Sequence, residues 1–203
     1  DVAPGEHELL LALPDAERAF AIHRFVRSHP LYVFVSVDWD RADTSDGELK
    51  WRLGLHAAHP ALRLTQFVGP STFTDPAAAA RAPLLIDWLQ ANETDFADET
   101  GLHIHPRCTF VDSTVVPCRS EPSYVDDAGD DDAGDDTGYT VLSTAYTEAE
   151  FTPLVAAADA LFVDAGFIKP TSHRAGGWIA DLGVLRALAA NGYVVDTSAR
   201  QSG

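Results

Sequence analysis

Two aspartates at the end of an apolar run are the first residues of this sequence that could carry out chemistry. Asp38 and Asp40 follow residues 33–37, which are three valines, a phenylalanine and a serine. β-Branched and aromatic residues in such a run predict a buried strand, and alternation along a strand places residues 38 and 40 on one face. Carboxylates are costly to keep at the end of a buried strand without a function. The pair therefore indicates the first part of a hydrolytic metal site.

Other predicted strand ends carry residues that bind metals or move protons, namely His103 and His105, Arg174, and Asp196. In a parallel α/β barrel the carboxyl ends of the strands share one face, so these side chains would converge with the aspartate pair. One carboxylate and two imidazoles form a set that suits a divalent metal such as zinc, with positions left open for water and substrate. A second carboxylate nearby can take the proton from that water.

Strands alternate with helices along the chain, which predicts an α/β fold with a parallel sheet or barrel. The expected strands cover residues 31–37, 62–68, 101–104, a stretch that begins at 167, and 193–196. The expected helices cover residues 75–90 with a break at Pro83, 148–165, and 180–190. The second of these has the clearest signals, because Thr147 and Glu150 form a capping box and Gly166 ends the helix.

Two segments differ in character from this alternation. Residues 1–30 are an expected N-terminal helical extension, which precedes the main domain at 31–203. The reason is the near-helical spacing of four apolar side chains, Phe20, Ile22, Phe25 and Val26. The main domain contains an acidic loop insertion at about 120–140. Residues 126–138 are nearly all Asp, Gly and Ala, which predicts a solvated surface loop, and their spacing does not match a calcium-binding EF-hand.

Composition excludes some partners. The chain has 203 residues, with 31 Asp and Glu against 14 Lys and Arg, so its formal net charge is −17. Nucleic acids and anionic membrane surfaces need basic patches, so neither is an expected partner. No apolar stretch approaches the roughly 18 residues of a membrane span. The acidic bias indicates either a protein adapted to high salt or an ordinary acidic protein from a high-GC genome. The absence of methionine indicates a processed chain or a fragment, which leaves localisation open.

The remaining cysteines and histidines receive simpler interpretations. Cys108 and Cys118 are the only cysteines, and they are either one disulfide or two unrelated thiols. A histidine next to Arg174, His173, is interpreted as a wall of the pocket. The other histidines are interpreted as surface or capping residues; they are His7, His23, His29, His56 and His59.

Five segments carry the candidate residues in a recurring order. They are Asp38-Trp39-Asp40, Leu64-Thr65-Gln66-Phe67-Val68, Glu99-Thr100-Gly101-Leu102-His103-Ile104-His105-Pro106, His173-Arg174-Ala175-Gly176-Gly177-Trp178, and Gly192-Tyr193-Val194-Val195-Asp196-Thr197-Ser198. In this order they resemble the motifs of the polysaccharide deacetylases, the NodB-homology esterases, over about residues 31–198. The resemblance implies a distorted, incomplete (β/α) barrel that removes N- or O-linked acetyl groups from a carbohydrate.

The resemblance also implies a role for each residue. Asp38 resembles the catalytic base, Arg174 the residue that holds this base, and Asp196 the residue that tunes a catalytic histidine. The implied ligands of a divalent metal, zinc before other transition metals, are Asp40, His103 and His105. The implied substrate contacts are Gly176, Gly177 and Trp178, since a tryptophan at a barrel mouth is a platform for a sugar ring.

The chain departs from the family pattern in three ways. Trp39 separates the aspartates, which are adjacent in the family, and the two histidines are two residues apart where the family has four. No histidine follows Arg174, so the last strands and the histidine that protonates the leaving group are missing from this sequence. Two alternatives therefore stay open: a catalytically weakened, glycan-binding relative of the same fold, and a metal-dependent amidohydrolase that acts on a small C–N substrate. The sequence predicts no oligomeric state.

Overall fold

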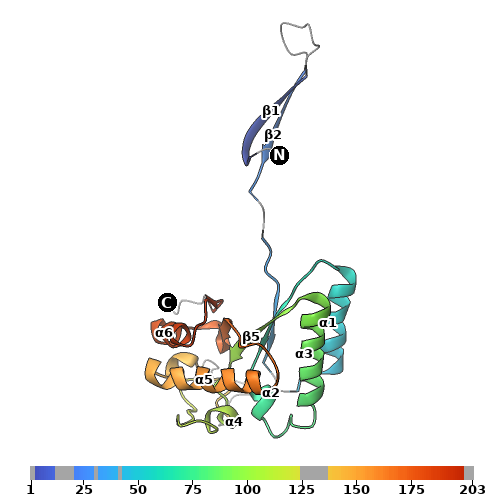
Figure 1. Ribbon diagram of the computed structural model, residues 1–203. Coiled ribbons are helices and arrows are strands. Elements are labelled where there is room, and N and C mark those ends of the chain that lie inside the picture. Colours follow the sequence, from blue (N-terminus) through green and yellow to red (C-terminus); the bar gives the residue numbers. More distant parts are fainter. Residues whose placement is uncertain (1–2, 12–20, 30–31, 41–42, 124–136, 199–203) are drawn as a thin grey trace. The chain divides into compact units, whose positions relative to one another are not determined.

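The computed structural model describes residues 3–11, 21–29, 32–40, 43–123 and 137–198. The chain divides into two compact units, residues 1–34 and 35–203. Figure 1 shows the helices and strands of both units, coloured along the sequence. All candidate site residues belong to the second unit.

The first unit is a two-stranded antiparallel hairpin and not the helix expected within residues 1–30. Strand β1 covers Gly5–Leu11 and pairs with β2 at Ala21–Arg27. The prediction of a helical extension is wrong for these segments, whereas residues 12–20 lie outside the described residues. β-Branched and aromatic side chains in β2 favour an extended backbone, and pairing with β1 provides hydrogen bonds for the backbone groups of β2 that face it. Four apolar positions were too few to distinguish a helical period from a strand.

The second unit is built on a five-stranded parallel sheet with the order β3-β4-β5-β6-β7. The strands are β3 at Ser36–Trp39, β4 at Thr65–Val68, β5 at Glu99–Ile104, β6 at Ser172–Ala175 and β7 at Val195–Asp196. Neighbours in the sheet are also successive strands along the chain, as in a (β/α) barrel, but a closed barrel of this type has eight strands. The predicted α/β class and the distorted, incomplete barrel are therefore confirmed.

Helices connect these strands. They are α1 at Asp46–Ala58, α2 at Ser71–Thr74, α3 at Ala82–Phe96, α4 at Cys108–Val111, α5 at Glu148–Asp164 and α6 at Leu182–Ala190, with 3₁₀ turns η1 at Ser143–Ala145 and η2 at Gly176–Trp178. Helix α5 has the predicted capping box, and α6 packs against it (Figure 1). Helix α1 begins with a capping box of Ser45 and Glu48 that the sequence interpretation missed. Within the described part of the chain, no helix has the length and apolar character that crossing a membrane requires.

Several strands are shorter than expected, β4, β6 and β7 among them, and two further elements differ in position or composition. The strand predicted at 31–37 is shifted to Ser36–Trp39, so Asp38 lies inside β3 and Asp40 directly follows it. The helix predicted at 75–90 is replaced by α2, a turn and α3. Its expected N-cap, Asp75, instead accepts a bond from the Ala77 amide at 2.9 Å, which closes a turn, and Pro83 lies in the first turn of α3. Proline fits there because the first amides of a helix have no intrahelical partner.

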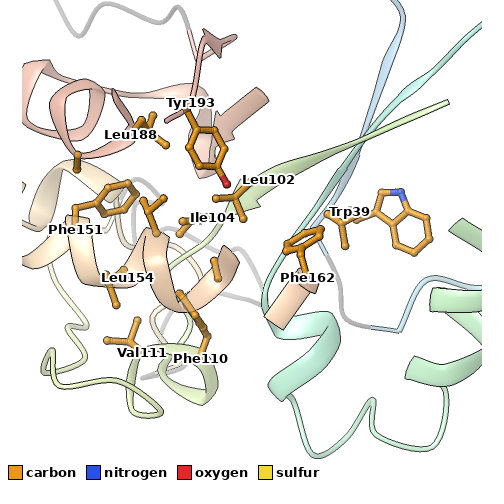
Figure 2. Close-up of a cluster of buried hydrophobic side chains, with 14 of the residues drawn as sticks. Trp39, Leu102, Ile104, Phe110, Val111, Phe151, Leu154, Phe162, Leu188 and Tyr193 are labelled. Carbon is orange, nitrogen blue, oxygen red and sulfur yellow. The ribbon is translucent and has the colours of Figure 1, made fainter. Parts of the chain in front are cut away.

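The hydrophobic core holds the middle of the sheet in place. Leu102 and Ile104 of β5 are fully buried, together with Phe151 and Leu154 of α5 and, nearly so, Leu188 of α6 (Figure 2). Side chains alternate along a strand, so burying residues 102 and 104 on one face directs residue 103 to the other face. The packing of β5 therefore orients the first of the two candidate histidines.

Candidate active site

A cavity of about 360 Å³ lies where the parallel strands end. It is lined by Asp38, Asp40, His103, His105, Tyr139, Gly177 and Trp178. Strands β3 and β5 and the residues that follow them supply the aspartates and histidines, and η2 after β6 supplies the glycine and the tryptophan. The structure thus brings together six of the residues predicted from the sequence, and it adds Tyr139.

Trp39 stands between the two aspartates and fixes their strand from the opposite face. Its side chain is 1% exposed, and its Nε1 donates to Oε1 of Gln66 on β4 at 3.0 Å. Gln66 donates in turn to Asp98, whose carboxylate also contacts Nε2 of His56 at 3.1 Å. His56 is buried, so its interpretation as a surface or capping residue is wrong. This buried network holds β3 against β4 and so sets the position of both aspartates.

Asp40, His103 and His105 form a compact set of candidate metal ligands. Oδ1 of Asp40 lies 3.0 Å from Nε2 of His103 and 3.3 Å from Nε2 of His105. The ligand atoms of the three residues all lie within 4.8 Å of one another. Both histidines are buried, whereas half of the Asp40 side chain is exposed to the cavity. One ion could therefore contact all three residues and still be open to a substrate.

Backbone carbonyls fix the orientation of both imidazole rings. Nδ1 of His103 lies 2.9 Å from the carbonyl oxygen of Arg174, and Nδ1 of His105 lies 2.8 Å from that of Tyr139. A carbonyl oxygen can only accept a hydrogen bond, so each Nδ1 carries the proton. In a neutral ring this leaves a lone pair on Nε2. Both Nε2 atoms face the same carboxylate oxygen of Asp40, so a protonated ring donates to it there, whereas a neutral ring offers its Nε2 lone pair to a metal ion.

The charges of the three residues fit a bound cation. Contacts with His103 and His105 hold the pKa of the Asp40 carboxyl well below its ordinary range, so Asp40 is ionised. Burial lowers the pKa of His105, which favours the neutral ring. Two neutral imidazoles and one carboxylate directed at one point are a donor set for a divalent metal, and the bond at each Nδ1 is the usual support of a metal-binding histidine.

Asp38 lies beside this set and is held by two donors. Nη1 of Arg174 donates to its Oδ1 at 2.7 Å, and Nε1 of Trp178 donates to its Oδ2 at 3.0 Å. Arg174 is itself fixed, because its Nε donates to Oγ1 of Thr197 at 3.0 Å and its guanidinium lies 4.5 Å from the ring centre of Phe67. The sequence interpretation expected the contact with Arg174 but not the one with Trp178.

The three residues of η2 contribute in different ways. Gly177 and Trp178 line the cavity, and Trp178 is 52% exposed. Gly176 is buried, and a Cβ added to it would lie 2.6 Å from Nδ1 of His105. Its expected contact with substrate therefore stays a prediction, while its observed role is to let the backbone approach the ring of His105.

Asp196 contacts a histidine that lies outside the cavity lining. Its Oδ1 accepts from Nδ1 of His173 at 2.8 Å and from Oγ of Ser198 at 2.7 Å. Burial lowers the pKa of His173, which is fully buried next to Phe151. Arg174 and His173 alternate on β6, so the arginine faces the cavity and the histidine does not. The interpretation of His173 as a pocket wall is therefore wrong, because it is a core residue paired with Asp196.

Comparisons with known proteins add a likeness of fold. A scan against protein-family models and a search of curated proteins each find no match. Among solved structures, the chain is similar to a family 4 carbohydrate esterase from Streptomyces lividans in complex with acetate, with 16% identity, a TM-score of 0.47, and coverage of 81% of this chain and 60% of the esterase. It is also similar to a candidate polysaccharide deacetylase from Mycobacterium smegmatis, with 15% identity, a TM-score of 0.42, and coverage of 80% and 49%. The chain thus spans less than two thirds of either protein. At this level of similarity the likeness concerns the fold and not the activity.

Proposed function

We propose that the protein is a metal-dependent hydrolase that removes N- or O-linked acetyl groups from a carbohydrate. One observation carries the proposal: the Nε2 atoms of two histidines meet the Asp40 carboxylate beside a second carboxylate, Asp38, that is paired with an arginine. Hydrolysis of an acetyl ester or amide needs both parts, an electrophilic centre and a base. The order of the motifs along the chain supports an acetylated sugar as the substrate.

Asp40, His103 and His105 would hold the metal, with zinc as the preferred ion because imidazole and carboxylate ligands suit it. A divalent ion at this position would activate a water molecule by lowering its pKa toward about 7 and would polarise the acetyl carbonyl. Asp38 would accept the proton of the attacking water. Arg174 and Trp178 hold its two oxygens in place, so the carboxylate needs little reorganisation before it reacts.

The same carboxyl group can return the proton to the leaving group. Attack of water transfers one proton to Asp38, and the departing alkoxide or amine needs one proton, so the two transfers balance. Asp38 is the only carboxyl besides Asp40 in the cavity lining of the described residues. The indole of Trp178 would pack against the sugar ring, as an exposed aromatic at a cavity mouth commonly does.

A glycan-binding relative with little turnover is the second candidate. The observation that favours it is the full burial of His173, which leaves no histidine besides His103 and His105 in the described cavity lining to serve as a separate acid. A metal-dependent amidohydrolase for a small C–N substrate would use the same metal ligands and base. The first candidate releases acetate from an acetylated carbohydrate, the second binds a glycan with little release of product, and the third cleaves a C–N bond in a small molecule.

Acetate release tests the proposal. The zinc-loaded protein is incubated with acetylated oligosaccharides and, separately, with small amides, and acetate and ammonia are measured. We expect acetate from the sugars only, and Asp38→Asn should lower its rate by about 10²- to 10⁴-fold, as loss of a general base does, while the metal stays bound. Sugar binding without any release would favour the glycan-binding candidate. Unchanged release by the variant would exclude Asp38 as the base.

A further inference from the structure

The chain segment at residues 137–139 contacts a candidate metal ligand directly. The carbonyl of Tyr139 accepts from Nδ1 of His105 at 2.8 Å, and the two rings stack with centres 4.4 Å apart and planes 27° apart. The guanidinium of Arg107 lies 4.2 Å from the centre of the Tyr139 ring. Tyr139 therefore fixes both the tautomer and the ring plane of His105, although 34 residues separate them in sequence.

The segment is held against the residues that follow His105. The amide of Cys108 donates to the carbonyl of Thr137 at 2.6 Å. Gly138 has a φ of +76°, and a Cβ at this position would lie 2.5 Å from the carbonyl oxygen of Pro106 and 3.2 Å from Sγ of Cys118. Only glycine fits this close approach without displacing its neighbours.

A disulfide closes the structure around this glycine. Cys108 and Cys118 are bonded, which settles the choice that the sequence left open. The bond ties Cys108, three residues after His105, to Cys118 on another side of Gly138. A Cβ added to Gly138 would lie 3.2 Å from Sγ of Cys118 and 3.3 Å from the carbonyl oxygen of Arg119. Releasing the disulfide would free these contacts, and Tyr139 would lose the support that keeps its carbonyl in line with Nδ1.

We infer that Tyr139 is a positioning residue for the metal ligand His105, and that Gly138 and the Cys108–Cys118 disulfide keep it in place. Metal affinity then depends on the oxidation state of a disulfide whose sulfurs do not belong to the metal ligand set. The inference rests on the proposed function, because it requires that His105 binds a metal. Loss of a partner that orients a metal-binding histidine typically weakens metal binding about 10- to 100-fold.

Metal titration of the full chain tests the inference. Zn²⁺ affinity is measured by competition with a chromophoric chelator, and the visible absorption of bound Co²⁺ reports the ligand geometry. The proteins are the oxidised wild type, Gly138→Ala, and a double variant, Cys108→Ala with Cys118→Ala, which avoids new thiols that would bind zinc themselves. The matched control is Gly54→Ala in α1, the same change at a position where an added Cβ meets nothing within 4 Å. Circular dichroism confirms that each variant is folded.

We expect about 10- to 100-fold weaker Zn²⁺ binding and a changed Co²⁺ spectrum in Gly138→Ala and in the double variant, with Gly54→Ala equal to the wild type. Folded variants that bind as tightly as the wild type would overturn the inference. So would unfolding of both test variants, because a positioning role requires a folded protein with weaker metal binding. A wild type that binds no metal would instead contradict the proposed function, which keeps the two failures distinct.

Discussion

The ion pair of Asp38 and Arg174 is predicted to stabilise the second unit by a coupling energy of about 2 to 3 kcal/mol. Oδ1 and Nη1 lie 2.7 Å apart, and the side chains of Asp38 and Arg174 are only 16% and 9% exposed. At an effective dielectric constant of about 20, two unit charges about 4 Å apart attract by about 4 kcal/mol. The exposed part of Asp38 and the ordering of a long arginine side chain reduce this value.

Urea unfolding of four metal-free proteins measures the coupling. They are the wild type, Asp38→Asn, Arg174→Met and the double variant, and the difference between the double variant and the sum of the single variants isolates the pair. The matched control is the exposed pair of Glu148 and Arg186, at 3.9 Å with 49% and 68% exposed side chains, for which at most about 1 kcal/mol is expected. A coupling for the first pair no larger than that of the control would refute the reasoning, because Arg174 would then not hold the base.

Two further predictions concern the stability of the fold. Burial and the bond to Asp159 raise the pKa of Tyr193, so folded Tyr193 keeps its proton where the unfolded chain, with a tyrosine pKa of about 10, loses it. The resulting contribution of Tyr193 to the free energy of unfolding is complete below about pH 10 and is lost as pH rises further. Tyr193→Phe should therefore reduce the fall of the unfolding free energy with rising alkaline pH. An equal slope of unfolding free energy against pH in the wild type and the variant would contradict this prediction. Gly101→Ala should lower the free energy of unfolding by about 1–3 kcal/mol, because the added Cβ would lie 2.7 Å from the Phe67 ring. Gly54→Ala, on the open surface of α1, should instead raise the free energy of unfolding by about 0.5–1 kcal/mol. Thermal unfolding that ranks these two variants in the opposite order would exclude the packing argument.

The parts of the fold that could be predicted are those with local signals. Helix α5 follows from its capping box and its apolar face, and it forms where expected. The convergence of Asp38, Asp40 and the two histidines follows from one topological rule, that parallel strand ends share an edge. The prediction for the N-terminal hairpin was wrong because its few apolar positions fit a helix or a strand equally well. The strand conformation depends on pairing between β1 and β2, which no local pattern shows.

The parts of the site that could not be predicted depend on backbone groups and on contacts distant in sequence. Tyr139 supports His105 through a carbonyl, which every residue has, so no residue type signals the contact. The pairing of Asp196 with His173 depends on β6 and β7 being neighbours, and burial of His173 depends on the helix packed over it. Sequence patterns indicated which residues carry chemistry but not which groups orient them.

Metal content tests the central claim most directly. The purified chain is dialysed against a low concentration of Zn²⁺ and then against metal-free buffer, and bound metal is measured per chain for the wild type, Asp40→Ala and His103→Ala. The geometry predicts one ion per wild-type chain and loss of that ion in both variants, with the fold retained by circular dichroism. A wild type without bound metal, or variants that hold it as tightly as the wild type, would contradict the account.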